Sequence, residues 1–174
     1  MNTASAQLLE ALDSLGGELD DAVRRAGGAD ATRAMTDLEL RELTQHVEAL
    51  GRRVDALRIA CAGEIDERSR PERGSERMSA QHGCANSVEL LTRLTGVSAR
   101  TAKGRARLGR ATLASVSLSG ETLPAPFPAV RAALSAGALG LDAADEITRG
   151  LAAVADRGDP VMLAAAESEL VAAA

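Results

Sequence analysis

A run of apolar residues at alternating intervals of three and four constrains the fold of this 174-residue chain more than any other feature. It comprises Leu40, Leu43, Val47, Leu50, Val54, Leu57 and Cys61, three heptads along one helical face. Thr36 and Glu39 form a capping-box pattern just before it, so the helix should begin at residue 37. Running to about residue 69 at ~1.5 Å per residue, it would be ~50 Å long. A helix of that length cannot bury its own stripe and needs a partner.

A second stripe of the same spacing supplies a partner. Residues 4–26 place Leu8, Leu12, Leu15, Leu19, Ala22 and Ala26 on one helical face, and Gly27 and Gly28 follow. The short connection predicts an antiparallel helical hairpin over residues 1–69 with coiled-coil-like packing and Cys61 in its core. The two seams could also pair between chains, which would give a dimer through the long hairpin.

The remaining residues read as a linker followed by shorter helices. Pro71, Gly74 and Gly83 interrupt residues 70–86, which we expect to form a linker. We expect residues 87–174 to form a compact helical region, with helix caps at Ser87, Ser98, Asp142 and Asp159. The last helix is still open at Ala174, so we expect the chain to be cut from a longer protein.

The composition agrees with an all-α fold. The chain has one Phe, no Trp and no Tyr, so small aliphatic residues must build the core, which suits close helix packing. No segment shows the alternation of a strand. We therefore expect a long antiparallel helical hairpin followed by a bundle of shorter helices that includes a helix-turn-helix-like unit.

Positive charge is concentrated in the middle of this acidic chain. Residues 70–120 hold nine basic and three acidic residues, a net charge of +6 in a chain of net charge −5. The segment from Leu90 to Ser98 predicts a helix, a glycine turn and a second helix, similar to a helix-turn-helix. The basic side chains of this unit are the candidate contacts to double-stranded DNA: Arg93, Arg100, Lys103, Arg107 and Arg110.

The last four of these basic residues fall within one ~80° sector of the second helix, beside its apolar face. Their spacing suits a row of phosphate contacts. The same spacing also suits a solvated stripe that is neutralised by the acidic residues of 1–69, and both interpretations stay open.

Catalytic and metal-binding patterns are missing from the sequence. The two histidines are His46 and His82, and the pair His82 and Cys84 lacks the further ligands of a structural zinc site. We expect no catalytic residue, metal, cofactor or small-molecule substrate. A signal peptide and an apolar run of ~20 residues are also missing, which predicts a cytoplasmic protein without a membrane partner.

One family resemblance rests on the order of motifs from Asn86 onward. The run from Asn86 to Ser98 leads into the Arg-rich helix, and Leu123-Pro124, the segment Ala132–Leu139 and a helix near Asp142 follow. This order resembles the actinobacterial domain of unknown function 222 over roughly residues 36–174. An aromatic residue that often lies near Leu90 in that family is missing here.

The resemblance implies an accessory helical domain, because that family domain typically precedes an HNH endonuclease module. The module needs His and Asn residues, and neither type occurs after Gly137. Nuclease activity therefore cannot be assigned to any residue of this chain, although a longer protein could be an endonuclease. We expect a non-catalytic domain that assists DNA binding through the basic helix. The alternative is an oligomerisation or partner-docking module that does not bind nucleic acid.

Overall fold

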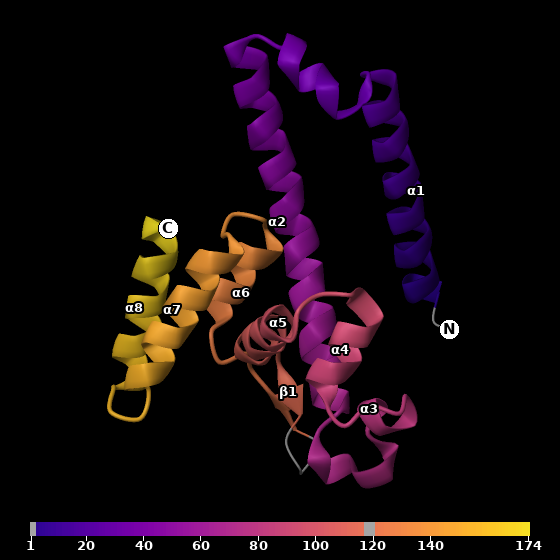
Figure 1. Ribbon diagram of the computed structural model, residues 1–174. Coiled ribbons are helices and arrows are strands. Elements are labelled where there is room, and N and C mark those ends of the chain that lie inside the picture. Colours follow the sequence, from indigo (N-terminus) through magenta and orange to yellow (C-terminus); the bar gives the residue numbers. More distant parts are fainter. Residues whose placement is uncertain (1–2, 117–120) are drawn as a thin grey trace. The chain divides into compact units, whose positions relative to one another are not determined.

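A computed structural model describes residues 3–116 and 121–174 of the chain (Figure 1). Residues 1–2 of the predicted hairpin and 117–120 of the predicted compact region lie outside the described residues. The chain divides into two compact units, Met1–Val47 and Glu48–Ala174. This division falls inside a long helix, whereas the sequence suggested a change of organisation at residues 70–86.

The first unit contains α1 (Thr3–Arg25), the 3-10 helix η1 (Gly28–Ala34) and the start of α2 (Asp37–Arg68). The chain leaves α1 through Gly27, whose φ of 96° is accessible mainly to glycine. The predicted capping box begins α2. The amide of Thr36 donates to Oε2 of Glu39 at 2.8 Å, and the amide of Glu39 donates to Oγ1 of Thr36 at 3.4 Å.

The two long stripes are not buried, which corrects the predicted hairpin packing. None of the described residues of α1 is buried, and Leu15 is 58% exposed. On α2, Leu50 is 44% exposed, and Cys61 is exposed rather than part of a core. The physical reason is that α2 turns a different face inward, the one that carries Ile59, Ala62 and Gly63.

The second unit confirms the all-α class. After α2 it contains η2 (Pro71–Glu76), α3 (Met78–Gln81), α4 (Ser87–Thr95), α5 (Ala99–Thr112), α6 (Pro128–Ser135), α7 (Leu141–Val154) and α8 (Pro160–Ala173). The strands β1 (Ser115–Val116) and β2 (Thr122–Leu123) have two residues each and pair antiparallel, with Ser115 opposite Leu123. They form one short ribbon beside the helices.

Two clusters of buried side chains hold this unit together. The smaller cluster joins Ala62 of α2, Leu91 of α4 and Ala102 and Ala106 of α5. The larger one joins α2 and α5 to α6 and α7 through Ile59, Leu108, Val130, Leu134, Leu139, Ala144, Ile147 and Leu151. The partly buried Leu163, Ala166 and Val171 of α8 pack against it. Residues 70–86, expected to be a linker, bury Ser79 and Cys84 in the same unit.

The helix caps follow the sequence in two cases and differ in two. Oγ of Ser98 accepts from the amide of Thr101 at 3.1 Å, and Asp159 caps α8 as predicted. The cap of α4 is Asn86 rather than Ser87, because the side chain of Asn86 accepts from the amide of Glu89. Gly140, rather than Asp142, takes the capping position before α7.

Within the part of the chain that the structure describes, every helix is too short or too polar to cross a lipid bilayer.

Candidate nucleic-acid interface

A close helix crossing decides which face of α5 is buried. A Cβ atom built on Gly109 would lie 2.5 Å from Cα of Gly63, so the backbones of α2 and α5 touch at this point. Ala102, Ala106 and Gly109 are buried on that side, as the spacing of the apolar face predicted. The crossing leaves Arg100, Lys103 and Arg107 on another side of α5, whereas Arg110 stays within reach of α2.

The basic flank forms one wall of an open groove between α5 and α7. The groove has a volume of ≈ 690 Å³, and Arg100, Lys103 and Arg107 of α5 line it together with Arg149 of α7. Asp142 and Asp145 also line it, so four cations face two carboxylates. The local charge is positive in a unit whose acidic and basic residues balance.

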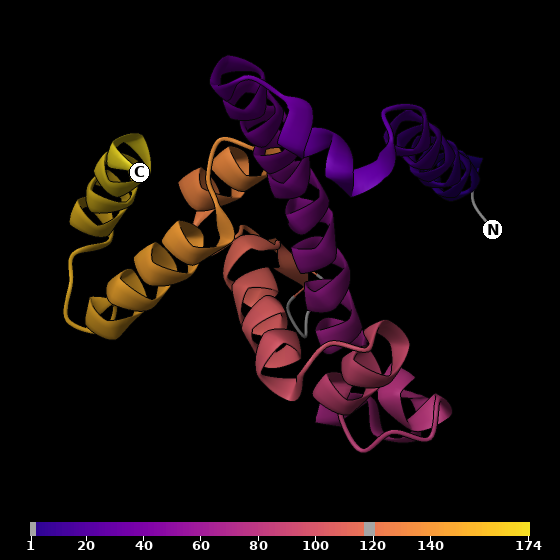
Figure 2. The same cartoon turned by 45° about the horizontal axis from the view of Figure 1, so that its top comes forward.

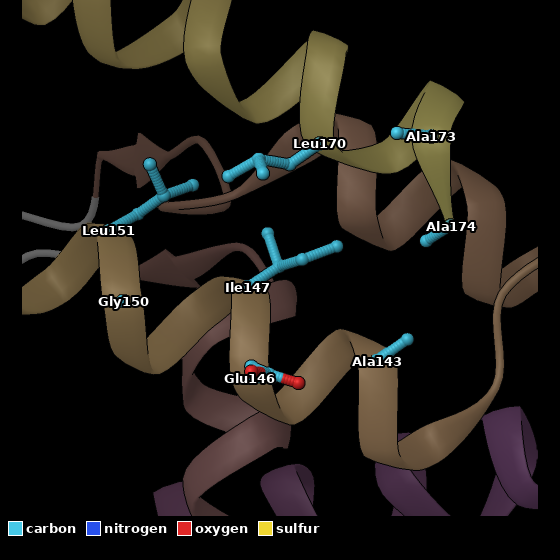
Figure 3. Close-up of a pocket in the computed structure, with 8 residues that line it drawn as sticks. All are labelled: Ala143, Glu146, Ile147, Gly150, Leu151, Leu170, Ala173 and Ala174. Atoms are coloured by element: carbon cyan, nitrogen blue, oxygen red, sulfur yellow. The ribbon is translucent and has the colours of Figure 1, made fainter.

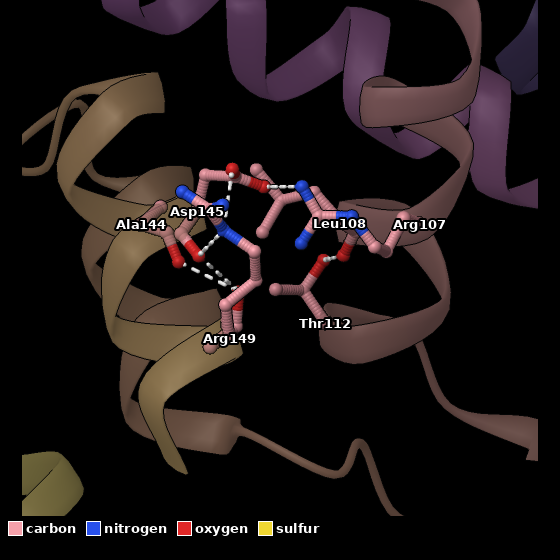
Figure 4. Close-up of polar contacts among 7 residues, drawn as sticks. Arg107, Leu108, Thr112, Ala144, Asp145 and Arg149 are labelled. Atoms are coloured by element: carbon pink, nitrogen blue, oxygen red, sulfur yellow. Dashed lines mark hydrogen bonds and ion pairs between the residues drawn. The ribbon is translucent and has the colours of Figure 1, made fainter. Parts of the chain in front are cut away.

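Asp145 joins two of the four cations (Figure 4). The guanidinium of Arg107 donates to Oδ1 of Asp145 across the space between the helices. Nε of Arg149 lies 3.1 Å from Oδ2 of the same carboxylate, one helical turn away on α7. One shared acid therefore holds two guanidinium groups in the wall of the groove.

Arg100 and Lys103 have no such partner. Both are exposed on the first two turns of α5, and neither makes a hydrogen bond or ion pair with another residue that the structure describes. Their charges are open to a ligand from solution.

The other two predicted DNA contacts lie outside the groove. Arg110 forms an ion pair with Asp66 of α2, and Asp66 also accepts a hydrogen bond from Ser87. Arg93 on α4 donates to the carbonyl oxygen of His82 at 3.3 Å. The structure therefore brings together three of the five predicted residues and adds Arg149, for which the sequence around α5 contains no signal.

The helix-turn-helix-like unit is present, but its second helix does not protrude as the recognition helix of a DNA-binding helix-turn-helix does. Gly96 has a φ of 70° and separates α4 from α5, as the sequence predicted. Figure 2 shows α5 with α7 on one side and α2 and α4 on the other. The first two turns of α5 remain open around the exposed Arg100 and Lys103, and Arg110 is exposed in its last turn.

Two further kinds of site, a metal centre and a second hollow, offer fewer polar groups for a ligand. Among residues 3–116 and 121–174, no three His, Cys, Asp or Glu side chains gather closely enough to hold a metal ion. A second hollow of ≈ 570 Å³ lies between α7 and α8 (Figure 3). Its walls are mainly apolar, from Ala143, Ile147, Leu151 and Leu170, and Glu146 at its edge is not joined by a second ionisable side chain among the lining residues.

No family model, curated protein or solved structure matches this chain.

Proposed function

We propose that this chain is a non-catalytic helical domain that contacts the phosphate backbone of double-stranded DNA. The observation that carries the proposal is the groove between α5 and α7, where four cations from two helices face one open space. Arginine and lysine are the side chains that commonly bind phosphate groups. Arg100 and Lys103 are available directly, and Arg107 and Arg149 are already oriented by Asp145.

The open part of α5 favours contacts with phosphates over contacts with base edges. A recognition helix that reads bases must enter the major groove. Because α5 packs against α4, α6 and α7, most of its surface is occupied. Binding through the exposed flank would therefore discriminate little between DNA sequences, since phosphate contacts carry no sequence information.

The resemblance to the domain of unknown function 222 supplies the wider context of the proposal. In that context the chain is the accessory domain of an HNH endonuclease-like protein, works in the cytoplasm and leaves catalysis to a separate module. An HNH motif encoded in frame with this chain would support this role.

The first test removes the two unpaired cations. We expect Arg100→Ala together with Lys103→Ala to weaken binding to unrelated duplexes about equally. The slope of log K against log salt should flatten by about 1.8, from ~0.9 per lost phosphate contact. The matched control is Arg73→Ala with Arg157→Ala, which removes the same charge from exposed positions outside the groove. If both double variants lost the same duplex affinity, the loss would follow from the change in net charge and would not support binding in the groove.

The second test changes the shared acid. Asp145→Asn removes a negative charge from the groove and releases Arg107 and Arg149, so duplex affinity should rise and its salt dependence should become steeper. Asp156→Asn makes the same charge change at an exposed turn and serves as the control. A titration in which Asp145→Asn binds no better than the control would contradict the use of this groove.

The alternative function, assembly with another protein chain, is favoured by a separate observation, the uncovered stripe of α2.

A further inference from the structure

Helix α2 has two apolar faces that point in different directions. Ile59, Ala62 and Gly63 face the interior of the second unit and are buried. The heptad residues Leu50 and Leu57 lie on another side of the same helix and are exposed. We call the second face the outward stripe of α2, and it consists of Leu40, Leu43, Val47, Leu50, Val54 and Leu57.

We propose that the outward stripe of α2 binds the same stripe of a second copy of this chain in an antiparallel two-helix interface. Val47 is 58% exposed and Leu40 is 42% exposed, although both belong to a continuous apolar row. Contiguous apolar surface of this kind is uncommon on monomeric proteins and marks interaction sites. Because the interior of the second unit uses another face of α2, a partner can occupy the stripe without disturbing that core.

The residue types on the stripe are those of a heptad core. Leu40, Val47 and Val54 occupy one of the two core positions of the heptad, and Leu43, Leu50 and Leu57 occupy the other. Large aliphatic side chains at both positions allow a second helix of the same kind to pack along the row.

The flanking charges decide the orientation of the two helices. A parallel pair would place Arg53 beside Arg58 of the second copy, twice per dimer, and like charges there oppose pairing. An antiparallel pair can set Val47 opposite Leu50 and Leu40 opposite Leu57. That register brings Arg58 beside Asp37 of the second copy, again twice, and so replaces repulsion with attraction.

The first experiment measures the mass of the full chain in solution, by sedimentation or light scattering at several concentrations. We expect a dimer for the wild type and a monomer for Leu50→Glu, with the helical content unchanged. Val161→Glu is the control, because Val161 is also an exposed apolar residue but lies on α8. A monomeric wild type would overturn the proposal.

The second experiment exchanges charges without touching the apolar row. Arg58→Asp should weaken the dimer at least tenfold, and Asp37→Arg should do the same. The double variant with both changes should recover most of the lost affinity, because the intermolecular pair is restored with its signs reversed. A double variant as weak as the single variants would overturn the antiparallel register.

The third experiment reads the orientation by disulfide formation in a Cys61→Ser background, since Cys84 is buried. Chains with Val47→Cys should cross-link to chains with Leu50→Cys when the two are mixed, and neither should cross-link well alone. In the wild type, exposed Cys61 should remain unlinked, because the antiparallel register separates it from its counterpart. Efficient linkage between two Cys61 residues would overturn the register in favour of a parallel pair.

Discussion

At the scale of single residues, one buried carboxyl group connects two helices. Glu167 on α8 is 3% exposed, and its Oε1 accepts a hydrogen bond from the amide of Val130 at 2.9 Å. Pro128 is the first residue of α6, so the amide of Val130 lies in the first turn, where no helical carbonyl can accept from it. Glu167 thus caps α6 from a distant part of the chain.

Removing this side chain should lower the free energy of unfolding. We expect Glu167→Ala to cost about 1–3 kcal/mol, because it leaves a buried donor without a partner. Glu167→Gln retains an oxygen acceptor of similar reach and should cost less. Denaturation in urea measures both variants, and equal stabilities of Glu167→Ala and the wild type would show that the cap contributes nothing.

Glu39 gives a pH-dependent contribution at the start of α2. The hydrogen bond from the amide of Thr36, followed by that from its hydroxyl, holds the pKa of Glu39 below its ordinary value. A carboxyl whose pKa is lower in the folded state stabilises the fold above its unfolded pKa, and this contribution is lost as pH falls through the folded pKa.

The pKa of Glu39 can be followed by NMR titration of its side-chain carboxyl. We expect a midpoint below that of an unfolded peptide, and a partial return toward it in Thr36→Ala, which removes the hydroxyl donor but keeps the amide. A midpoint that is the same in wild type and Thr36→Ala would mean that the hydroxyl has no part in the shift.

At the scale of elements, the turn and cap between α4 and α5 could be predicted, whereas the buried face of α2 could not. Gly96 and Ser98 mark helix ends through their own residue type. Gly96 ends α4 in a left-handed conformation and Ser98 caps α5 with its side chain, both at the predicted positions. The buried face of α2 was misjudged because periodicity favours the face with the longest row of leucine and valine. Gly63 contributes nothing to such a row, yet the close passage of α5 over it decides which face is covered.

The crossing of α2 and α5 should tolerate no added carbon atom. Gly109→Ala should destabilise the second unit by about 1–3 kcal/mol through overpacking, although alanine is the better helix former. Gly150→Ala is the control, because its added Cβ would meet no described atom within 4 Å, and it should be neutral or stabilising. Thermal unfolding of the two variants gives the comparison, and a stabilised Gly109→Ala would contradict the tight crossing.

At the scale of the whole molecule, the candidate site could be predicted only in part. The spacing of Arg100 and Lys103 was enough to place them on an open flank of α5. Arg149 lies 49 positions after Arg100 in the chain, so no local pattern links the two residues. The ion pairs of Arg107 with Asp145 and of Arg110 with Asp66 likewise depend on helices that meet only in the folded unit.

Local stability should differ strongly between α1 and the second unit. The described part of α1 contains no buried side chain, whereas α5 buries Ala102, Ala106 and Leu108. Isolated helices are only marginally stable in water, so the amides of α1 should exchange with deuterium much faster than those of α5. Exchange measured by mass spectrometry tests this, and equal protection of both helices would indicate that a partner helix covers the leucines of α1.

The carboxylate shared by Arg107 and Arg149 has a consequence for ligand selectivity. A single small anion must compete with the carboxylate of Asp145, which is part of the same fold and already pairs with both guanidinium groups. Replacing that contact would therefore contribute little binding free energy. A strand that already occupies Arg100 and Lys103 brings its next phosphate to the pair at a high effective concentration. Under the proposed function, we therefore expect the groove to bind a chain of linked phosphates more tightly than free phosphate or a single nucleotide.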